Sequence, residues 1–275
     1  MGFNKRLISV SGLFIGLLCF WIVGLVFAAG KAQKADGPKF VPGAEVRIDV
    51  DNKHIGGDHF LVYVPSDYTE KKDWPVIFFY HGASGQPTTW PFRQATGGEG
   101  FIIIGMGYVE HGKGKVTRSE YLNHLKRERK SVLEVKRYVS RYLKVDKKRL
   151  FIAGFSKGGW HTSVMLECST KVWAGAVIFA AGRSRNAGLI TTDARKKAIL
   201  GKPIYIGTGE TDQNLPAAKR AVTYYERLGA KVTFEEFKGA GHSFDPSKSE
   251  ILHNWLLTNS SAEDVTSARA DEKPS

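Results

Sequence analysis

The feature that most constrains this chain is a short apolar run that leads directly into a serine flanked by glycines. Residues 151–160 read Phe-Ile-Ala-Gly-Phe-Ser-Lys-Gly-Gly-Trp, which places Gly154 and Gly158 two residues on either side of Ser156. A serine on a sharp strand-to-helix turn leaves no room for side chains at those two positions. The same pattern without the strand and helix indicates only a flexible Ser/Gly turn. Here the sequence predicts a buried strand, a tight turn that exposes the Ser156 hydroxyl above a sheet, and a helix.

Short β-rich runs alternate with helical patterns along most of the chain. The runs are residues 45–50, 60–65, 76–80, 101–105, 151–154, 174–179, 204–208 and 232–237. The later runs are almost entirely apolar, as expected for parallel strands covered on both faces, whereas the first two alternate in polarity, as expected at an antiparallel edge. The sequence therefore predicts an α/β fold with a mostly parallel sheet and helices on both faces.

The clearest helix is predicted at about 120–143. Its apolar residues recur at spacings of three, four or seven and form one stripe that packs against the sheet: Tyr121, Leu125, Val132, Val135, Val139 and Tyr142. Three further helices are expected, one after Ser156, one at about 217–228 and one at about 248–257.

The first thirty residues differ from the rest of the chain. Lys5 and Arg6 precede an uncharged apolar run at 7–29 that ends in small residues. This pattern fits a signal peptide cleaved near Ala28 or Ala29, although the run exceeds the usual apolar length of about 7–15 residues. A run of about 20 apolar residues also spans a bilayer. Residues 1–30 are therefore either a signal peptide or a membrane anchor, and the protein is expected to be periplasmic, secreted, or anchored in the membrane with its folded domain outside.

The remaining boundaries follow from composition. Residues 31–43 are small and polar and predict a linker, residues 44–257 are expected to form the folded domain, and residues 258–275 predict a disordered tail.

The net charge is +13, but the basic residues are spread over several segments without interleaved aromatics, which argues against nucleic-acid binding. Cys19 and Cys168 are the only cysteines, so the exported protein would have no internal disulfide. The histidine and cysteine spacings indicate no metal site.

If Ser156 attacks a carbonyl group in an acyl transfer, an oxyanion forms and needs hydrogen-bond donors. Two segments are candidates for supplying them. The apolar run at 76–80 ends in His81 and Gly82, and backbone N–H groups of such a small-residue loop can converge on a developing negative charge. The predicted donors are the amides of Ala83 and of Lys157, which directly follows Ser156. His81 is expected to shape the loop and not to act as a base, because a general base should follow the candidate nucleophile, Ser156, in the chain.

The base and the acid are expected after the last two predicted strands. His242 lies in the glycine-rich segment 239–244, from which a short loop can bring an imidazole to the serine. The acid is expected in segment 209–214, where Asp212 is favoured over Glu210 because Glu210 lies closer to the end of the strand. Asp193 and Asp245 are more distant alternatives.

The chain order Ser156, Asp212, His242, with His81 and Gly82 upstream, resembles the α/β-hydrolase superfamily. Within it, residues 45–257 are similar to single-domain serine esterases: polyhydroxybutyrate depolymerases, feruloyl and acetyl xylan esterases, and the phospholipase/carboxylesterase group. The most specific match is segment 145–159, in which an aspartate and an arginine precede the strand. The resemblance implies an eight-stranded sheet, an acyl-enzyme route and no cofactor. Lys157 departs from it, since these enzymes often have an uncharged residue there. The lysine either favours anionic substrates or is simply solvated.

The expected function is hydrolysis of small-molecule or polymer-linked carboxylic esters. The short segment 180–203 leaves no room for a large lid domain. Trp90 and Phe92 are weak candidates for substrate-binding walls and could equally belong to the core. The alternatives are a prolyl-oligopeptidase-like peptidase and a catalytically silent binding protein on the same fold. The oligomeric state and the natural ester stay open.

Overall fold

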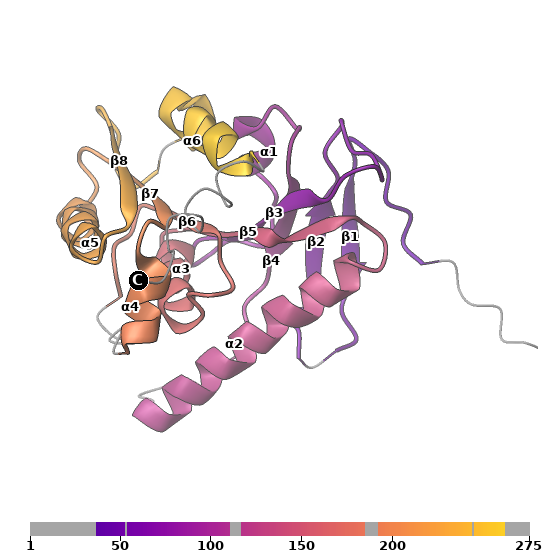
Figure 1. The fold of residues 1–275 in the computed structure, drawn as a ribbon, viewed down its shortest axis with the longest axis horizontal. Helices are drawn as coiled ribbons and strands as arrows, with labels where there is room; N and C mark the ends of the chain where they lie inside the picture. The colour runs from indigo at the N-terminus through magenta and orange to yellow at the C-terminus, as the bar shows by residue number, and fades with distance from the viewer. Residues whose placement is uncertain (1–36, 53, 111–116, 185–191, 244, 262–275) are drawn as a thin grey trace, which may run out of the picture. The chain divides into compact units, whose positions relative to one another are not determined.

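The protein is described by a computed structural model that covers residues 37–52, 54–110, 117–184, 192–243 and 245–261. The predicted signal or anchor segment, residues 31–36 of the linker and residues 262–275 of the predicted tail lie outside these ranges. The described part of the chain forms one eight-stranded sheet with the order β1-β2-β4-β3-β5-β6-β7-β8 (Figure 1). The strands are β1 Glu45–Asp49, β2 His59–Tyr63, β3 Trp74–Tyr80, β4 Ile102–Met106, β5 Val145–Phe155, β6 Gly175–Phe179, β7 Pro203–Gly209 and β8 Lys231–Phe237.

The strand directions confirm the sequence-based prediction of a mostly parallel sheet. β1 pairs with β2 and β2 with β4 in antiparallel fashion. The remaining neighbours, from β4–β3 through to β7–β8, are all parallel. β3, β4 and β6 are buried along their whole length, while β1 alternates between exposed residues and residues that are partly or fully buried. This contrast arises because the central strands are covered on both faces and β1 lies at the edge.

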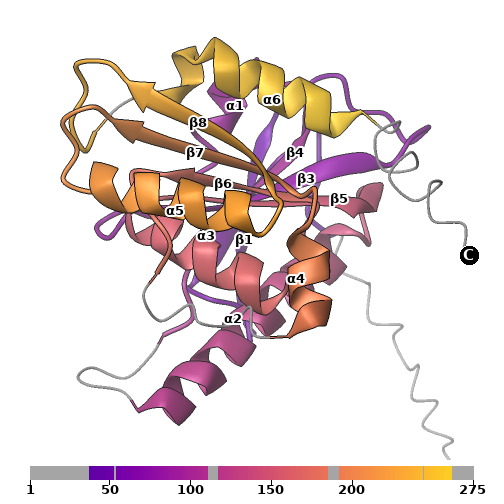
Figure 2. The ribbon, with the colours of Figure 1, turned by 60° about the vertical axis from the view of Figure 1, so that its left-hand side comes forward.

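Helices cover both faces of the sheet, as predicted (Figure 2). The helices are α1 Phe92–Ala95, α2 Arg118–Val139, α3 Lys157–Cys168, α4 Asp193–Ile199, α5 Leu215–Arg227 and α6 Glu250–Ser260, with a 3-10 turn η1 at Pro246–Lys248. One core cluster joins residues of α1 and α6 to one side of the strands, and the other joins residues of α2, α3, α4 and α5 to the opposite side. The sheet is thus the middle layer of three.

Helix α2 begins and ends earlier than the periodicity predicted. Thr117 caps its N-terminus in a capping box, because its side chain accepts from the Glu120 amide and the Glu120 carboxylate accepts from the Thr117 amide. The helix ends at Val139, and the following Tyr142 packs against Phe40 with ring centroids 5.4 Å apart. Tyr142 is 39% exposed, whereas Leu143 of the same turn is buried in the core, so the predicted apolar stripe loses its last member to the surface.

The domain also extends slightly past its predicted limits. The Gly43 amide donates to the Val64 carbonyl at 2.9 Å, and Phe40 packs on the core, so the end of the predicted linker lies against the domain. Helix α6 continues to Ser260, three residues beyond the predicted boundary at 257.

In the ranges that the structure covers, no helix is long and apolar enough to cross a membrane.

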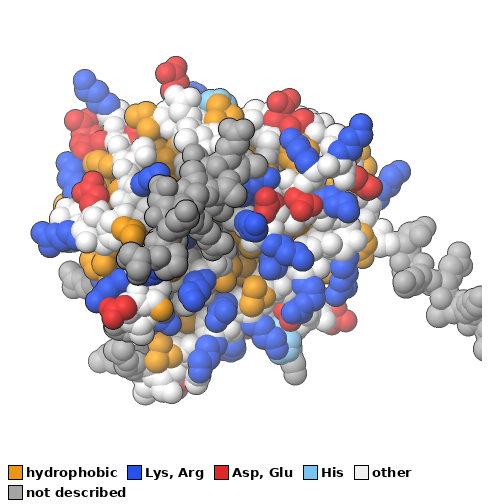
Figure 3. All heavy atoms as spheres, viewed as in Figure 1, with side chains coloured by type: hydrophobic (Ala, Val, Ile, Leu, Met, Phe, Trp, Pro, Cys, Tyr) orange, Lys and Arg blue, Asp and Glu red, His pale blue; other side chains and the backbone are white. Residues whose placement is uncertain are grey.

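Lys and Arg side chains occur over much of the face seen in Figure 3, and over its lower part they are more frequent than Asp and Glu side chains. Helix α2 contributes several exposed basic residues, namely Lys126, Arg127, Arg129, Lys130 and Arg137. The Arg137 guanidinium is paired with the Glu134 carboxylate one turn away.

Leu252 and Leu257 offer a matched test of the packing between α6 and the sheet. Leu252 is fully buried in the core below α6, whereas Leu257 on the same helix is 55% exposed. We expect Leu252→Ala to lower the free energy of unfolding by about 2–5 kcal/mol, because it removes buried methyl groups and leaves a cavity. Leu257→Ala should change it by less than about 0.5 kcal/mol. Urea unfolding of both variants measures this, and equal effects would contradict the assigned packing.

Candidate active site

Ser156 lies on the sharp turn between β5 and α3. Its backbone angles are φ 54° and ψ −112°, a conformation that is rare for a non-glycine residue. The Ser156 amide is held by the Phe179 carbonyl at 2.9 Å. A Cβ atom on Gly154 would overlap the backbone of Gly158, and one on Gly158 would overlap the Tyr80 carbonyl oxygen. The two flanking glycines are therefore required by backbone contacts, for the reason that the sequence pattern indicated.

A chain of hydrogen bonds links Ser156 to a buried carboxylate. His242 Nε2 lies 2.9 Å from Ser156 Oγ, and His242 Nδ1 lies 3.1 Å from both carboxylate oxygens of Asp212. These residues follow the carboxyl ends of β5, β7 and β8. The three strands run parallel, so their carboxyl ends lie on the same side of the sheet. The arrangement allows the imidazole to take a proton from the hydroxyl, while the carboxylate fixes the imidazole tautomer and stabilises the imidazolium.

Neighbouring donors hold the Asp212 carboxylate in place. Its side chain is completely buried, the Asn214 amide donates to it at 2.8 Å, and the Thr208 hydroxyl donates to it at 3.3 Å. A buried charge needs such partners, because its loss of hydration is otherwise uncompensated. The His242 side chain, in contrast, is 40% exposed, so one side of the site faces solvent.

The other carboxylates considered from the sequence lie elsewhere. Glu210 accepts a hydrogen bond from the Gly239 amide at 2.7 Å, which braces the base of the loop that carries His242. Asp193 lies in the first turn of α4 and pairs with Lys196 at 3.3 Å. Asp245 caps η1 by accepting from the Ser247 amide. The structure therefore brings only Asp212, among these four, to His242.

The His81–Gly82 loop borders Ser156, as the sequence suggested. An ideal Cβ on Gly82 would lie 3.8 Å from the Ser156 Cβ. His81 Nδ1 lies 2.6 Å from the Gly82 carbonyl oxygen and donates to it. Burial lowers the pKa of His81, and the nearby Lys157 ammonium lowers it further. Ala83 is exposed at the tip of this loop, and Lys157 is the first residue of α3.

Of the two roles left open for Phe92, a substrate-binding wall or the core, the structure supports the core. This residue is fully buried and packs between Phe79 and Phe179, with ring centroids 5.5 and 5.9 Å away. It belongs to the core cluster that α1 and α6 form on one face of the sheet. Trp90 is 43% exposed in the loop before α1, and its role in substrate binding stays a prediction.

Sequence analysis missed a buried polar cluster beside the site. Glu128 on α2 is fully buried and accepts from the Val109 amide at 2.9 Å. His124 Nε2 lies 3.5 Å and His161 Nε2 lies 3.8 Å from the Glu128 carboxylate. Burial raises the pKa of Glu128 to about 8 and lowers that of His161 to about 3. The signal was available, since Glu128 falls between Leu125 and Val132 on the apolar stripe of α2.

Neither this cluster nor any other group of described residues is arranged to hold a metal ion.

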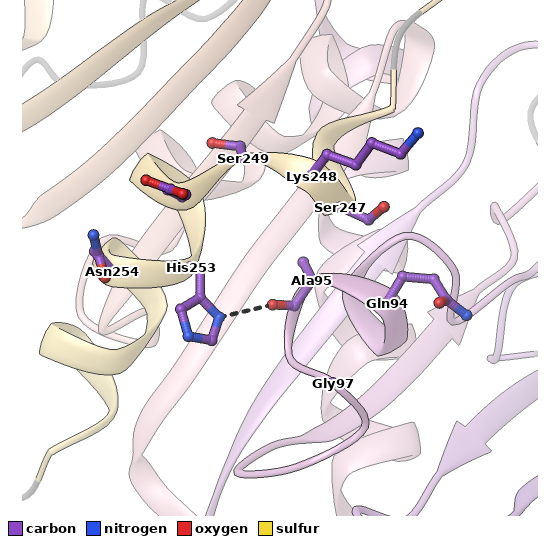
Figure 4. Close-up of a pocket in the computed structure, with 9 residues that line it drawn as sticks. Gln94, Ala95, Gly97, Ser247, Lys248, Ser249, His253 and Asn254 are labelled. Carbon is purple, nitrogen blue, oxygen red and sulfur yellow. Dashed lines mark hydrogen bonds between the residues drawn. The ribbon is translucent and has the colours of Figure 1, made fainter.

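A separate cleft of about 490 Å³ lies between α1 and the η1–α6 segment (Figure 4). His253 Nδ1 crosses it and donates to the Ala95 carbonyl at 3.1 Å. Ser156, Asp212 and His242 do not line this cleft, so it is distinct from the candidate active site.

The strand-turn-serine arrangement, followed in the chain by a carboxylate and a histidine at the same sheet edge, is that of an α/β hydrolase. Comparison with known families agrees with this class. The profile of the dienelactone hydrolase family matches residues 107–272, and the chain belongs to that family.

Individual relatives are more distant. A protein described as a probable carboxylesterase SOBER1-like, from Arabidopsis thaliana, is 25% identical over 115 residues, which is 41% of this chain and 43% of that protein. The chain thus spans less than half of this relative. The CE1 ferulic acid esterase of Anaeromyces mucronatus has a TM-score of 0.57 at 16% identity, covering 82% of this chain and 92% of the other. The S-formylglutathione hydrolase FrmB of Staphylococcus aureus has a TM-score of 0.56 at 20% identity, covering 82% and 99%. These two structures share the fold.

Glu128 predicts a specific pH dependence of stability. Its pKa is raised from 4.5 to about 8, so its contribution to stability is complete below pH 4.5 and is lost as the pH rises through 8. Between pH 5 and 8, this loss should reach up to about 4 kcal/mol in the free energy of unfolding. We expect the free energy of unfolding to decline less over this pH range in Glu128→Gln, because glutamine cannot ionise.

Glu134→Gln is the matched control on the same helix. The pKa of Glu134 is lowered, chiefly by its hydrogen bond from Arg137. The stability that Glu134 contributes is therefore present above pH 4.5 and is lost only on acidification. This variant should keep the wild-type slope between pH 5 and 8. Urea unfolding at several pH values measures all three proteins, and an undiminished slope in Glu128→Gln would contradict the assignment.

Proposed function

We propose that this protein is a serine hydrolase that cleaves carboxylic esters, with Ser156 as nucleophile, His242 as general base and Asp212 as the acid that orients it. The observation that carries the proposal is the unbroken hydrogen-bond chain from the Ser156 hydroxyl through His242 to the buried Asp212 carboxylate, with distances of 2.9 and 3.1 Å. Membership of a hydrolase family and a fold shared with esterases support the same reaction class.

The first half of the reaction forms an acyl-enzyme. Ser156 Oγ attacks the ester carbonyl carbon while its proton moves to His242 Nε2, and the carbonyl oxygen becomes an oxyanion. The imidazolium then gives its proton to the alkoxide as the ester C–O bond breaks. In the second half, water attacks the acyl carbon with His242 again as base, and the acid leaves as Ser156 regains its proton.

The oxyanion is proposed to bind the amides of Ala83 and Lys157. The Lys157 amide belongs to the first turn of α3, where N–H groups have no carbonyl partner within the helix and the helix dipole is positive. The loop that carries Ala83 lies next to Ser156, because Gly82 approaches the Ser156 Cβ closely. Fixed donors aimed at the developing charge lower the barrier without reorganising during the reaction.

The substrate class is proposed to be small-molecule or polymer-linked esters at an open site. The partial exposure of His242 supports access from solvent. Between β6 and β7, the described residues contain only the seven-residue helix α4, which fits the expectation that no large lid domain covers the site.

A p-nitrophenyl ester series from acetate to long acyl chains tests this function. We expect Ser156→Ala to lower kcat/KM by at least about 10³-fold, because it removes the hydroxyl that lies 2.9 Å from His242 Nε2. Asp212→Asn should lower kcat by about 10²–10⁴-fold, since the amide favours the wrong imidazole tautomer.

Glu210→Gln is the matched control for the acid, because its amide oxygen can still accept from the Gly239 amide. Its kcat should stay within about threefold of the wild-type value. A larger loss in Glu210→Gln than in Asp212→Asn would assign the acid to Glu210. Full activity of Ser156→Ala would exclude the proposed mechanism.

We also propose that the enzyme acts outside the cytoplasm, on the basis of the basic start and apolar run at residues 1–29. Expression of the full chain in a bacterial host, with N-terminal sequencing of the exported protein, separates the two versions of this proposal. A start near Ala29 or Gly30 identifies a signal peptide, and an intact N-terminus in the membrane fraction identifies an anchor. Recovery of the intact protein from the cytosol would contradict both.

A further inference from the structure

Tyr108, which follows β4, contacts both segments that border Ser156. Its hydroxyl donates to the His81 carbonyl at 2.5 Å, and its ring meets the His81 ring edge-on with centroids 4.9 Å apart. On the other side, the Lys157 ammonium lies 4.0 Å from the centre of the same ring. One side chain thus bridges the loop after β3 and the first residue of α3.

The surroundings of Tyr108 fix its backbone firmly. The amide of the next residue, Val109, donates to the buried Glu128 carboxylate at 2.9 Å. Gly56 packs on the peptide between Tyr108 and Val109 so closely that a Cβ at Gly56 would lie 2.5 Å from its atoms. The Tyr80 ring lies against the Tyr108 ring at 5.3 Å. The residue is therefore braced by α2, by the loop before β2, and by β3.

We propose that Tyr108 is a positioning residue for the oxyanion site, holding the His81–Ala83 loop against the start of α3, and that Glu128 fixes Tyr108 through the Val109 amide. This inference rests on the proposed function, in which the amides of Ala83 and Lys157 bind the oxyanion. Tyr108 itself does not touch the reacting atoms and acts through the two segments that supply these amides.

The physical reason lies in the orientation of the peptide after His81. The Tyr108 hydroxyl holds the His81 carbonyl, which sets the plane of the His81–Gly82 peptide and the direction in which the loop continues. Oxyanion donors need a narrow range of distance, and losing one costs about 10²–10³-fold in kcat. The Lys157 ammonium on the ring adds a cation–π contact that holds the two segments together.

Tyr108→Phe removes the hydroxyl and keeps the ring. With p-nitrophenyl acetate, we expect kcat to fall by about 10–100-fold while KM stays within about twofold, because substrate binding is retained and oxyanion binding is weakened. Tyr63→Phe is the matched control, since the Tyr63 hydroxyl also donates to a backbone carbonyl, that of Gly98, at 3.1 Å. Its kcat should stay near the wild-type value. Equal kcat in Tyr108→Phe and the wild type would overturn the proposal.

Hydrogen exchange of the full-length protein tests the loop without turnover. The Gly85 amide donates to the Gly82 carbonyl at 3.2 Å, so peptides covering residues 82–87 report on the loop. We expect exchange there to be faster in Tyr108→Phe and unchanged in Tyr63→Phe. Unchanged exchange in Tyr108→Phe would overturn the proposal. Full activity of Ser156→Ala would instead overturn the proposed function, while the exchange result would still decide whether Tyr108 holds the loop.

Glu128 provides a second pair of variants. Glu128→Ala removes the acceptor of the Val109 amide and should shift kcat and the exchange of residues 82–87 in the same direction as Tyr108→Phe. Glu128→Gln keeps an oxygen acceptor and should shift both less. Equal effects of the two substitutions would remove Glu128 from the proposed arrangement.

Discussion

The direct packing of the turn around Ser156 on the end of β3 is the contact from which the rest of the site is built. Gly158 lies against the Tyr80 carbonyl and Gly154 against the backbone of Gly158, so this approach tolerates no side chain at either position. The contact puts the serine in its rare backbone conformation and places the start of α3 beside the loop after β3. The hydroxyl, the helix N-terminus and the candidate oxyanion loop thereby share one corner of the sheet.

Two buried carboxyl groups near that corner have different partners. The Asp212 carboxylate accepts from the Asn214 amide and the Thr208 hydroxyl and lies against the His242 imidazole. Glu128 has one amide donor and two histidines, and burial raises its pKa to about 8. The first arrangement is suited to stabilising a positive imidazolium during proton transfer. The second keeps its carboxyl protonated at neutral pH and serves to hold the segment after β4.

The alternation of apolar runs and helical patterns was sufficient to predict the layers, and the glycine-flanked serine was sufficient to predict the turn. All eight predicted strands form, and the change from alternating to continuous apolar character correctly marked the antiparallel edge. The positions of Asp212 and His242 after the last strands also followed from local sequence. These features were predictable because each depends on periodicity or on a steric requirement within a few residues.

Other features depend on which distant residues meet. Phe92 is core and not a pocket wall, because α1 directs it between Phe79 and Phe179. Glu210 and Asp212 lie two residues apart, and only the way in which the loop after β7 folds against β8 turns Asp212 to the histidine and Glu210 to the Gly239 amide. Tyr108 and Glu128 belong to segments far from Ser156 in the chain. Local pattern thus predicted the architecture and the candidate residue types, whereas tertiary packing decided which side chains meet them, because hydrogen bonds and burial depend on neighbours that sequence spacing does not specify.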